Sequence, residues 1–180
     1  MAKFMEQLPE ALQRFIENQK IFFVATAAAD GRINLSPKGL DALRIISPTE
    51  VVWLNLTGSG NETAAHLLAV NRITLMFCSF DEKPLILRLY GRAEVIHQND
   101  SEWNKYYSMF PNTPGARQVF KMHIESLQTS CGFGVPLLEF TGHRDQLNKW
   151  AEAKGEEVLI AYQREKNAIS IDGLETGLPT

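Results

Sequence analysis

The stretch IFFVATAAADGRINLSPKG, residues 21–39, decides the fold, because it contains two strand-like runs joined by a tight turn. Residues 21–28 are rich in aromatic, β-branched and small apolar residues, and Asp30-Gly31 is a dipeptide strongly favoured in two-residue hairpin turns. The returning strand is expected to start at Ile33. The sequence therefore predicts an antiparallel hairpin near the start of the sheet.

The strand pattern continues through most of the chain. Six further segments carry the apolar runs or the alternation typical of strands: residues 43–46, 51–56, 72–80, 85–96, 122–130 and 135–142. Turn signals such as Ser47-Pro48 separate them, and there is no regular alternation of strands with helices. We therefore expect a mainly β fold with helices, built as a small antiparallel barrel.

Helical spacing of apolar residues marks both ends of the chain and some connections. Helices are expected over residues 5–19, after the loop at 57–61 to about 69, over 103–110, over 115–121, and over two last segments that end at Gly155 and Asn167. At 180 residues the chain fits one domain, residues 1–180. The barrel is expected at about 20–142 and a C-terminal helical extension at about 144–168.

The composition is that of an ordinary soluble protein and argues against several classes. A formal net charge of −3 gives no general attraction to nucleic acid or to anionic membranes. The N-terminus lacks the apolar core of a signal peptide, and no apolar run approaches the length of a membrane span. The two cysteines and four histidines have no metal-ligand spacing. We expect a cytoplasmic protein without a metal site.

A row of polar side chains lies on the returning strand of the hairpin. Because side chains alternate between the two faces of a strand, Asn34, Ser36 and Lys38 share one face. An amide, a hydroxyl and an ammonium group in one row can donate hydrogen bonds to an anion or to a heteroaromatic edge. The alternative interpretation is a solvated outer face of a barrel strand.

The loop LTGSGNETAAHL, residues 56–67, leads into a short helix. Two glycines allow a close backbone approach to a ligand, and free N–H groups at a helix start attract phosphate. Ser59 can cap the helix, with Glu62 three residues later completing a capping box. An anion cradle and a plain capped turn both explain the stretch.

The strand at residues 85–96 carries Arg88, Tyr90 and Arg92 on one face, opposite three leucines. An arginine in such a strand often faces a charged partner, because an unpaired buried charge is costly. That partner is either a ligand or an acidic side chain within the fold.

Taken in order, these segments resemble the pyridoxamine 5′-phosphate oxidase-like, FMN-binding split-barrel proteins. The resemblance rests on FVATAAADGRINLSPKG, VVWLNLTGSGNETAAHL, RITLMFCSF and ILRLYGRAEVI, and it continues through TSCGFGVPLLEF and KNAISIDGL. It implies an antiparallel split β-barrel with helical ends. It also implies a homodimer with two FMN sites at the subunit interface.

The same resemblance assigns residues to the cofactor. The polar edge or phosphate of the flavin would be met by Asn34, Ser36 and Lys38. The flavin and its ribityl phosphate would be lined by the loop residues Leu56, Thr57, Gly58, Ser59, Gly60, Asn61, Glu62 and Thr63. Arg88 would be a further anion partner from one of the two subunits. The partner chain would bring to the ring Ser130, Cys131, Gly132 and Phe133.

The function implied by the resemblance is that of an FMN-dependent oxidoreductase acting on a small molecule, with Lys38 stabilising negative charge on the flavin. Family members with oxidase activity usually carry Arg and Lys where this chain has Glu62 and Thr63. A basic C-terminal segment for pyridoxal phosphate is also missing, so the named oxidase activity is not expected. The alternatives are a non-catalytic module that binds flavin or another anion, and a dimeric interaction protein.

Overall fold

The hairpin expected at residues 21–39 is present. In the structure, a computed structural model that describes residues 2–179, β2 (Phe22–Thr26) pairs antiparallel with β3 (Asn34–Lys38), and Thr26 lies opposite Asn34. The other strands are β1 (Lys3–Met5), β4 (Leu43–Ser47), β5 (Glu50–Leu56), β6 (Ile73–Cys78), β7 (Ile86–His97) and β8 (Ala116–Ser130). The helices are α1 (Glu10–Asn18), α2 (Glu62–Ala69), α3 (Trp103–Tyr107), α4 (Gln146–Lys154) and α5 (Glu156–Lys166).

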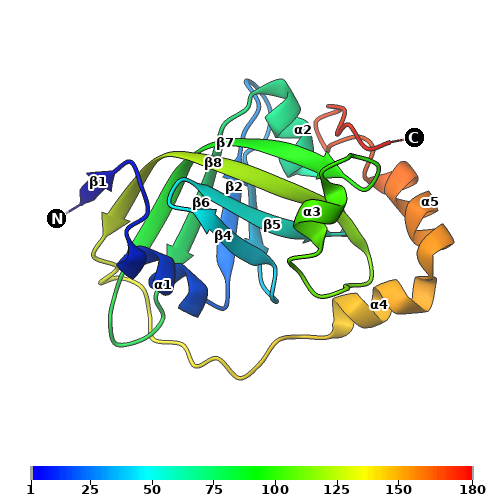
Figure 1. Cartoon of the computed structure of the whole chain (residues 1–180). Helices are drawn as coiled ribbons and strands as arrows, with labels where there is room; N and C mark the ends of the chain where they lie inside the picture. Colours follow the sequence, from blue (N-terminus) through cyan, green and yellow to red (C-terminus); the bar gives the residue numbers. More distant parts are fainter. Residues whose placement is uncertain (1, 180) are drawn as a thin grey trace.

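All eight strands belong to one antiparallel sheet in the order β3-β2-β6-β7-β8-β5-β4, with β1 added beside β8. The long strands β7 and β8 pair along most of their length in the middle of the sheet (Figure 1). The edge strands β3 and β4 do not pair with each other, so the sheet curls into a barrel with an open seam. The Lys38 ammonium of β3 donates a hydrogen bond to the Asn55 side-chain oxygen of β5 at 3.1 Å, so side chains connect the two halves of the sheet near the seam.

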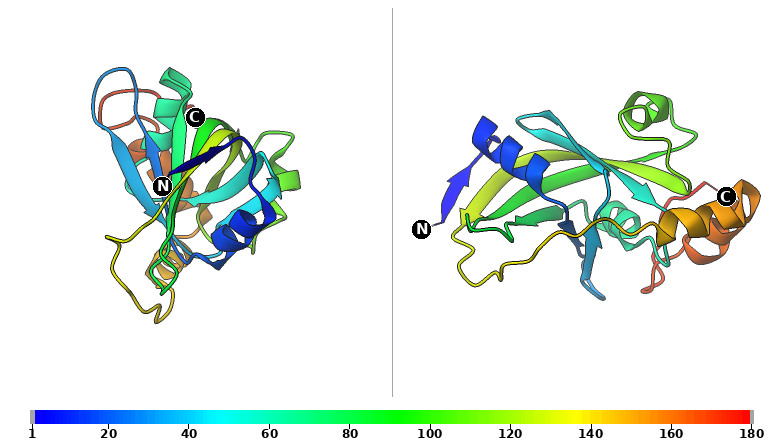
Figure 2. Two further views of the ribbon diagram at one scale, coloured as in Figure 1. Left: turned by 90° about the vertical axis from the view of Figure 1, so that its left-hand side faces the viewer. Right: turned by 90° about the horizontal axis from the view of Figure 1, so that it is seen from below.

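Apolar side chains from the inner face of the sheet form the main core. Trp53 of β5 and Phe120 of β8 stack with ring centroids 4.8 Å apart, and both are fully buried. α1 adds Ile16 to this core and covers one end of the barrel, while α4 and α5 lie at the other end (Figure 2). None of the helices in residues 2–179 is long and apolar enough to cross a membrane.

The helix expected over residues 115–121 is wrong, because residues 116–121 belong to β8 and Gly115 lies in the turn before it. The segment pairs with both neighbours: Phe120 lies opposite Trp53 of β5 and Val95 of β7. Ladder hydrogen bonds and burial on both sides outweigh a weak local helical pattern. The expectation of a strand at residues 122–130 is confirmed as the second half of the same long strand.

The strand expected over residues 135–142 is also absent. The segment runs as an irregular connection from the end of β8 to α4 (Figure 1), and its apolar side chains, among them Leu137 and Leu138, are exposed. An apolar run predicts a strand only when a sheet edge is free to pair with it. Conversely, β1 was not predicted from the sequence, because three residues are too short to show a pattern.

Gly91 tests the register of the two central strands. The β7–β8 pairing shifts between Tyr90 and Gly91, and a Cβ at Gly91 would lie 1.9 Å from the His123 carbonyl oxygen. Gly91→Ala should therefore lower the free energy of unfolding by about 2–3 kcal/mol, measured by urea denaturation. At Gly134 an added Cβ meets nothing within 4 Å, so Gly134→Ala is the control. Equal stability of the two variants would contradict this register.

Candidate functional site

A cavity of about 250 Å³ opens between β3, the end of β5 and the loop that leads into α2. Its walls are formed by Asn34, Ser36, Lys38, Asn55, Leu56, Gly58, Ser59, Gly60, Asn61, Glu62, Thr63 and Arg117. All of these except Asn55 and Arg117 were predicted as site residues from the sequence. The strand row and the glycine-containing loop therefore meet in one place.

The polar row on β3 faces this cavity, so the interpretation of a solvated outer face is wrong. The Asn34 amide donates hydrogen bonds to the hydroxyl oxygens of Thr26 at 3.0 Å and Thr63 at 3.1 Å. The Thr26 hydroxyl also lies 3.1 Å from Nδ1 of the buried His66. Asn34 is therefore fixed between β2 and α2, and it holds the edge strand against the helix that follows the loop.

Two cationic side chains, Lys38 and Arg117, contribute to the cavity wall. Burial, with a smaller contribution from the Arg117 guanidinium, lowers the pKa of Lys38 from 10.5 to about 8. Burial likewise lowers the pKa of Arg117 to about 10. Each shift means that the surrounding protein disfavours the charged form of the group.

Neither cation forms an ion pair with any carboxylate in residues 2–179. Arg117 is 4% exposed, and its Nε finds no hydrogen-bond partner within the same range. Because a buried charge is costly unless it is paired, the two cations supply positive potential that an anion in the cavity would balance.

A neutral residue at the end of α5 holds the arginine. Arg117 Nη1 donates to the Asn167 side-chain oxygen at 2.5 Å and to the Gly60 carbonyl at 3.2 Å. The Asn167 side-chain nitrogen donates in turn to the Gly58 carbonyl at 3.0 Å. Asn167 therefore connects the arginine to Gly58, and the arginine itself contacts Gly60.

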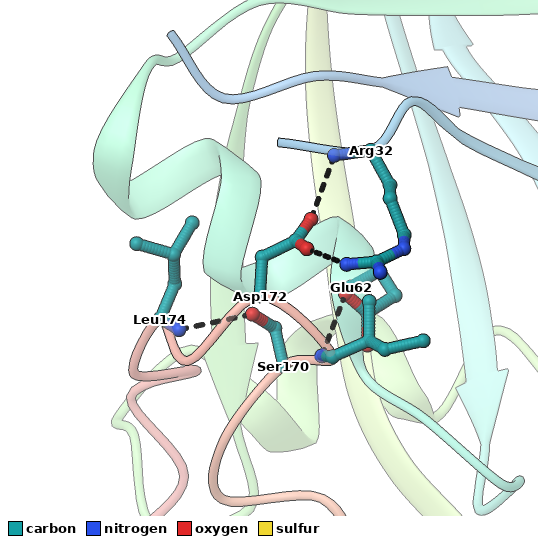
Figure 3. Close-up of polar contacts among 6 residues, drawn as sticks. Arg32, Glu62, Ser170, Asp172 and Leu174 are labelled. Atoms are coloured by element: carbon teal, nitrogen blue, oxygen red, sulfur yellow. Dashed lines mark hydrogen bonds and ion pairs between the residues drawn. The ribbon is translucent and has the colours of Figure 1, made fainter. Parts of the chain in front are cut away.

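The C-terminal segment after α5 contacts the β2–β3 turn and the start of α2 (Figure 3). The Asp172 carboxylate accepts the Arg32 main-chain N–H at 2.7 Å and pairs with the Arg32 guanidinium. The Glu62 carboxylate accepts the Ile171 main-chain N–H at 3.1 Å. The segment thus ties the β2–β3 turn to the start of α2.

These contacts overturn the expected capping box. α2 begins at Glu62 with Asn61 as its N-cap residue, so Ser59 lies too far upstream to cap it. The Glu62 side chain is used by the C-terminal segment, which a local sequence pattern could not show. Glu62 nevertheless lies in the first turn of α2, where its negative charge is favourable.

Thr57 differs from the other predicted loop residues, because its hydroxyl does not line the cavity. It donates to the Gly115 carbonyl at 2.9 Å and accepts a hydrogen bond from the Gln163 side chain of α5 at 2.8 Å. Thr57 therefore helps to dock α5 against the loop.

Two of the remaining predicted residues, Arg88 and Ser130, lie on the other face of the sheet. Arg88 pairs with Met76, Met76 with Phe23, and Phe23 with Pro37, and directly paired residues share a face. Pro37 faces away from Ser36 and Lys38. Arg88 donates to the Ser130 hydroxyl at 3.3 Å, and the next three residues follow β8 into the irregular connection: Cys131, Gly132 and Phe133. Within one chain these residues do not reach the cavity.

Arg117 and Asn167 were missed from the sequence for different reasons. Arg117 falls in the segment predicted to be helical, so no face could be assigned to it. Its one signal is a charged residue within the largely apolar, buried start of β8. Asn167 carries no local signal beyond its place at the end of a helix, because its role depends on contacts with residues about 50 and 109 positions away.

Fold and site together define a class: a split antiparallel barrel with a cationic cavity near its open seam. The family profile described as pyridoxamine 5′-phosphate oxidase matches residues 8–131. A pyridoxamine 5′-phosphate oxidase family protein of Aspergillus flavus, ustO, is 40% identical over 194 residues, which cover 97% of this chain and 77% of the relative. The chain belongs to the pyridoxamine 5′-phosphate oxidase family.

Solved structures confirm the split-barrel fold. A Lactobacillus delbrueckii protein, provisionally assigned as a pyridoxamine 5′-phosphate oxidase, aligns with a TM-score of 0.55 at 22% identity and covers 68% of this chain and 98% of its own. HupZ of group A Streptococcus aligns with a TM-score of 0.55 at 20% identity, covering 67% and 91%. At these identities the likeness concerns the fold alone.

The pKa of Lys38 makes the stability of the ligand-free protein depend on pH. Between about pH 8 and 10.5 the folded chain has lost the Lys38 proton while the unfolded chain still binds it. The free energy of unfolding should therefore gain up to about 1.4 kcal/mol per pH unit from this group as pH rises through that window. Lys38→Met removes this gain.

The measurement is urea unfolding of flavin-free wild type and Lys38→Met at several pH values from 7 to 10.5. The stability of the variant relative to wild type should fall as pH rises through the window. Lys20→Met, at an exposed lysine, controls for the loss of one positive charge. A stability difference that stays constant across the window would contradict the burial of a charged Lys38.

Proposed function

We propose that the protein binds FMN in this cavity and acts as an FMN-dependent oxidoreductase on a small molecule. The observation that carries the proposal is the pair of cations, Lys38 and Arg117, which line the cavity and form no ion pair with a carboxylate in residues 2–179. Membership of the pyridoxamine 5′-phosphate oxidase family supports FMN as the anion.

The residues of the cavity fit a phosphate monoester carried on a polar chain. Arg117 Nε and the Asn61 side-chain oxygen are buried without hydrogen-bond partners in the described chain, so the protein leaves polar groups beside the cavity unsatisfied. Lys38 and Arg117 would hold the phosphate through charge-assisted hydrogen bonds. Ser36 and Ser59 add hydroxyl groups that can donate to phosphate or ribityl oxygens.

In this chain Arg117 compensates for the loop composition. Glu62 and Thr63 stand where basic residues are usual in the oxidases, but the Glu62 carboxylate is engaged by Ile171. A guanidinium from β8 then supplies charge that the loop lacks. When bound, FMN supplies hydride and electron transfer, and the protein supplies its orientation and the electrostatics around it.

A homodimer is part of the proposal, because one chain offers an incomplete site. A cavity of about 250 Å³ lies below the roughly 300–1,000 Å³ usual for cofactor and ligand pockets. On the sheet face of Arg88, Leu35 is 63% exposed and Phe4 is 71% exposed, and Phe133 nearby along the chain is 82% exposed. A second copy packed on this face of the sheet would cover these side chains and bring its residues 130–133 to the flavin.

The second candidate is a module that binds FMN without catalysis. The titratable side chains of the cavity are Lys38, Glu62 and Arg117, and the two cations can bind a phosphate whether or not the site is catalytic. This composition suits a site that relies on the cofactor for chemistry and also suits a passive carrier. Reduction of protein-bound FMN by NADH or NADPH distinguishes the enzyme from the carrier.

The phosphate contacts can be tested by comparing FMN with riboflavin, which lacks the phosphate. Lys38→Met and Arg117→Met should each weaken FMN binding by about 10- to 100-fold, because each removes a charged hydrogen-bond donor worth about 1.5–3 kcal/mol. Their riboflavin affinity should change far less. Flavin fluorescence titration provides the measurement, with Lys20→Met as the control. Equal losses for both flavins would contradict the assignment of these cations to the phosphate.

The interface can be tested at Leu35, which is exposed in the single chain. Leu35→Asp should leave the fold intact but weaken the dimer, because it places a charge in a buried apolar contact. Sedimentation velocity at several protein concentrations should show more monomer, and FMN affinity should fall in parallel. Val158→Asp, at an exposed position on α5, is the control. A monomeric wild-type protein with full FMN affinity would refute the interface site.

A further inference from the structure

The inference concerns the residue that pairs with the buried arginine of the cavity. A buried arginine is usually balanced by a carboxylate, because its charge is costly to leave unpaired. Here the partner at 2.5 Å is the amide oxygen of Asn167, a neutral group that is itself fully buried. Arg117 is therefore held in place without being neutralised.

Several contacts fix the orientation of the Asn167 amide. Its side-chain nitrogen donates to the Gly58 carbonyl at 3.0 Å, so the oxygen must be the atom that faces Arg117. Its main-chain carbonyl accepts the Thr176 hydroxyl at 2.7 Å and the Asn61 amide at 3.5 Å. The Gly58 carbonyl and the Arg117 guanidinium thus fix the orientation of the amide, while Thr176 and Asn61 hold the main chain of Asn167 in place.

We propose that Asn167 is the positioning residue of the cavity: a neutral partner that directs Arg117 and leaves its positive charge to a phosphate monoester. The inference rests on the proposed phosphate-binding role of the cavity. One guanidinium nitrogen, Nη1, donates hydrogen bonds to Asn167 and to Gly60. The buried Nε remains without a hydrogen-bond partner in residues 2–179, so the protein does not use the full donor capacity of the guanidinium. An aspartate at this position would instead supply the counter-charge itself.

Substituting Asn167 by Asp and by Ala separates the effect of an added negative charge from the effect of losing the side-chain hydrogen bonds. Asn167→Ala removes the hydrogen bonds of the side chain and adds no charge. Asn167→Asp keeps the size of the side chain but places a carboxylate beside Arg117. If the charge of Arg117 serves the ligand, Asn167→Asp loses more phosphate affinity than Asn167→Ala, although it is the smaller change in shape.

The experiment measures FMN and riboflavin affinity, together with the thermal stabilisation that inorganic phosphate gives to the flavin-free protein. Asn167→Asp should weaken FMN binding by at least about tenfold relative to Asn167→Ala and should abolish the phosphate-induced shift. Riboflavin affinity should be equal in the two variants. Asn104→Asp, which makes the same charge change at an exposed position of α3, should behave as wild type.

Equal FMN losses in the two Asn167 variants, or parallel losses for FMN and riboflavin, would overturn the inference and leave Asn167 a purely structural residue. If Asn167→Asp does not fold, Asn167→Ala decides: an FMN-to-riboflavin affinity ratio equal to that of wild type overturns the inference. A wild-type protein that responds to inorganic phosphate but not to FMN would refute the proposed function alone. A wild-type protein that responds to neither would refute both.

Discussion

The arrangement of the site depends on two positive charges at the seam of the barrel that form no ion pair with a carboxylate within residues 2–179. Lys38 extends from the edge strand β3 and Arg117 from the start of β8, so the two charges come from opposite sides of the opening. Their repulsion and desolvation cost stability in the free protein. The fold tolerates this cost because the long β7–β8 ladder and the core around Trp53 and Phe120 are formed by other residues.

The C-terminal segment gives this family member its particular site. Where oxidases of the family carry basic loop residues, this chain has Glu62, which binds the segment instead of an anion. Asn167 and Asp172 then fasten the segment to the loop and to the β2–β3 turn. The positive charge is supplied by Arg117 on a rigid strand, which orders it better than a flexible loop could.

The sequence predicts the features that depend on neighbouring residues, but not those that depend on contacts between distant parts of the chain. Asp30-Gly31 and the alternation around it predict the β2–β3 hairpin, and the same alternation places Asn34, Ser36 and Lys38 on the face that lines the cavity. Residues 115–121 were assigned to a helix, because a strand paired on both sides has no period-2 pattern to reveal it. Because of that wrong assignment, Arg117 was not predicted as a residue of the site. Asn167 could not be predicted, since its partners are joined to it only by the tertiary fold.

The central claim is that Lys38 and Arg117 together bind the phosphate of FMN. Asn167 positions Arg117 for this contact without neutralising its charge. A crystal structure of the protein with FMN tests this claim most directly. The account predicts the phosphate within hydrogen-bond distance of the Lys38 ammonium and the Arg117 guanidinium, with the contact between Arg117 and Asn167 preserved. An FMN phosphate bound away from both cations, or an Arg117 side chain turned to a carboxylate, would contradict it.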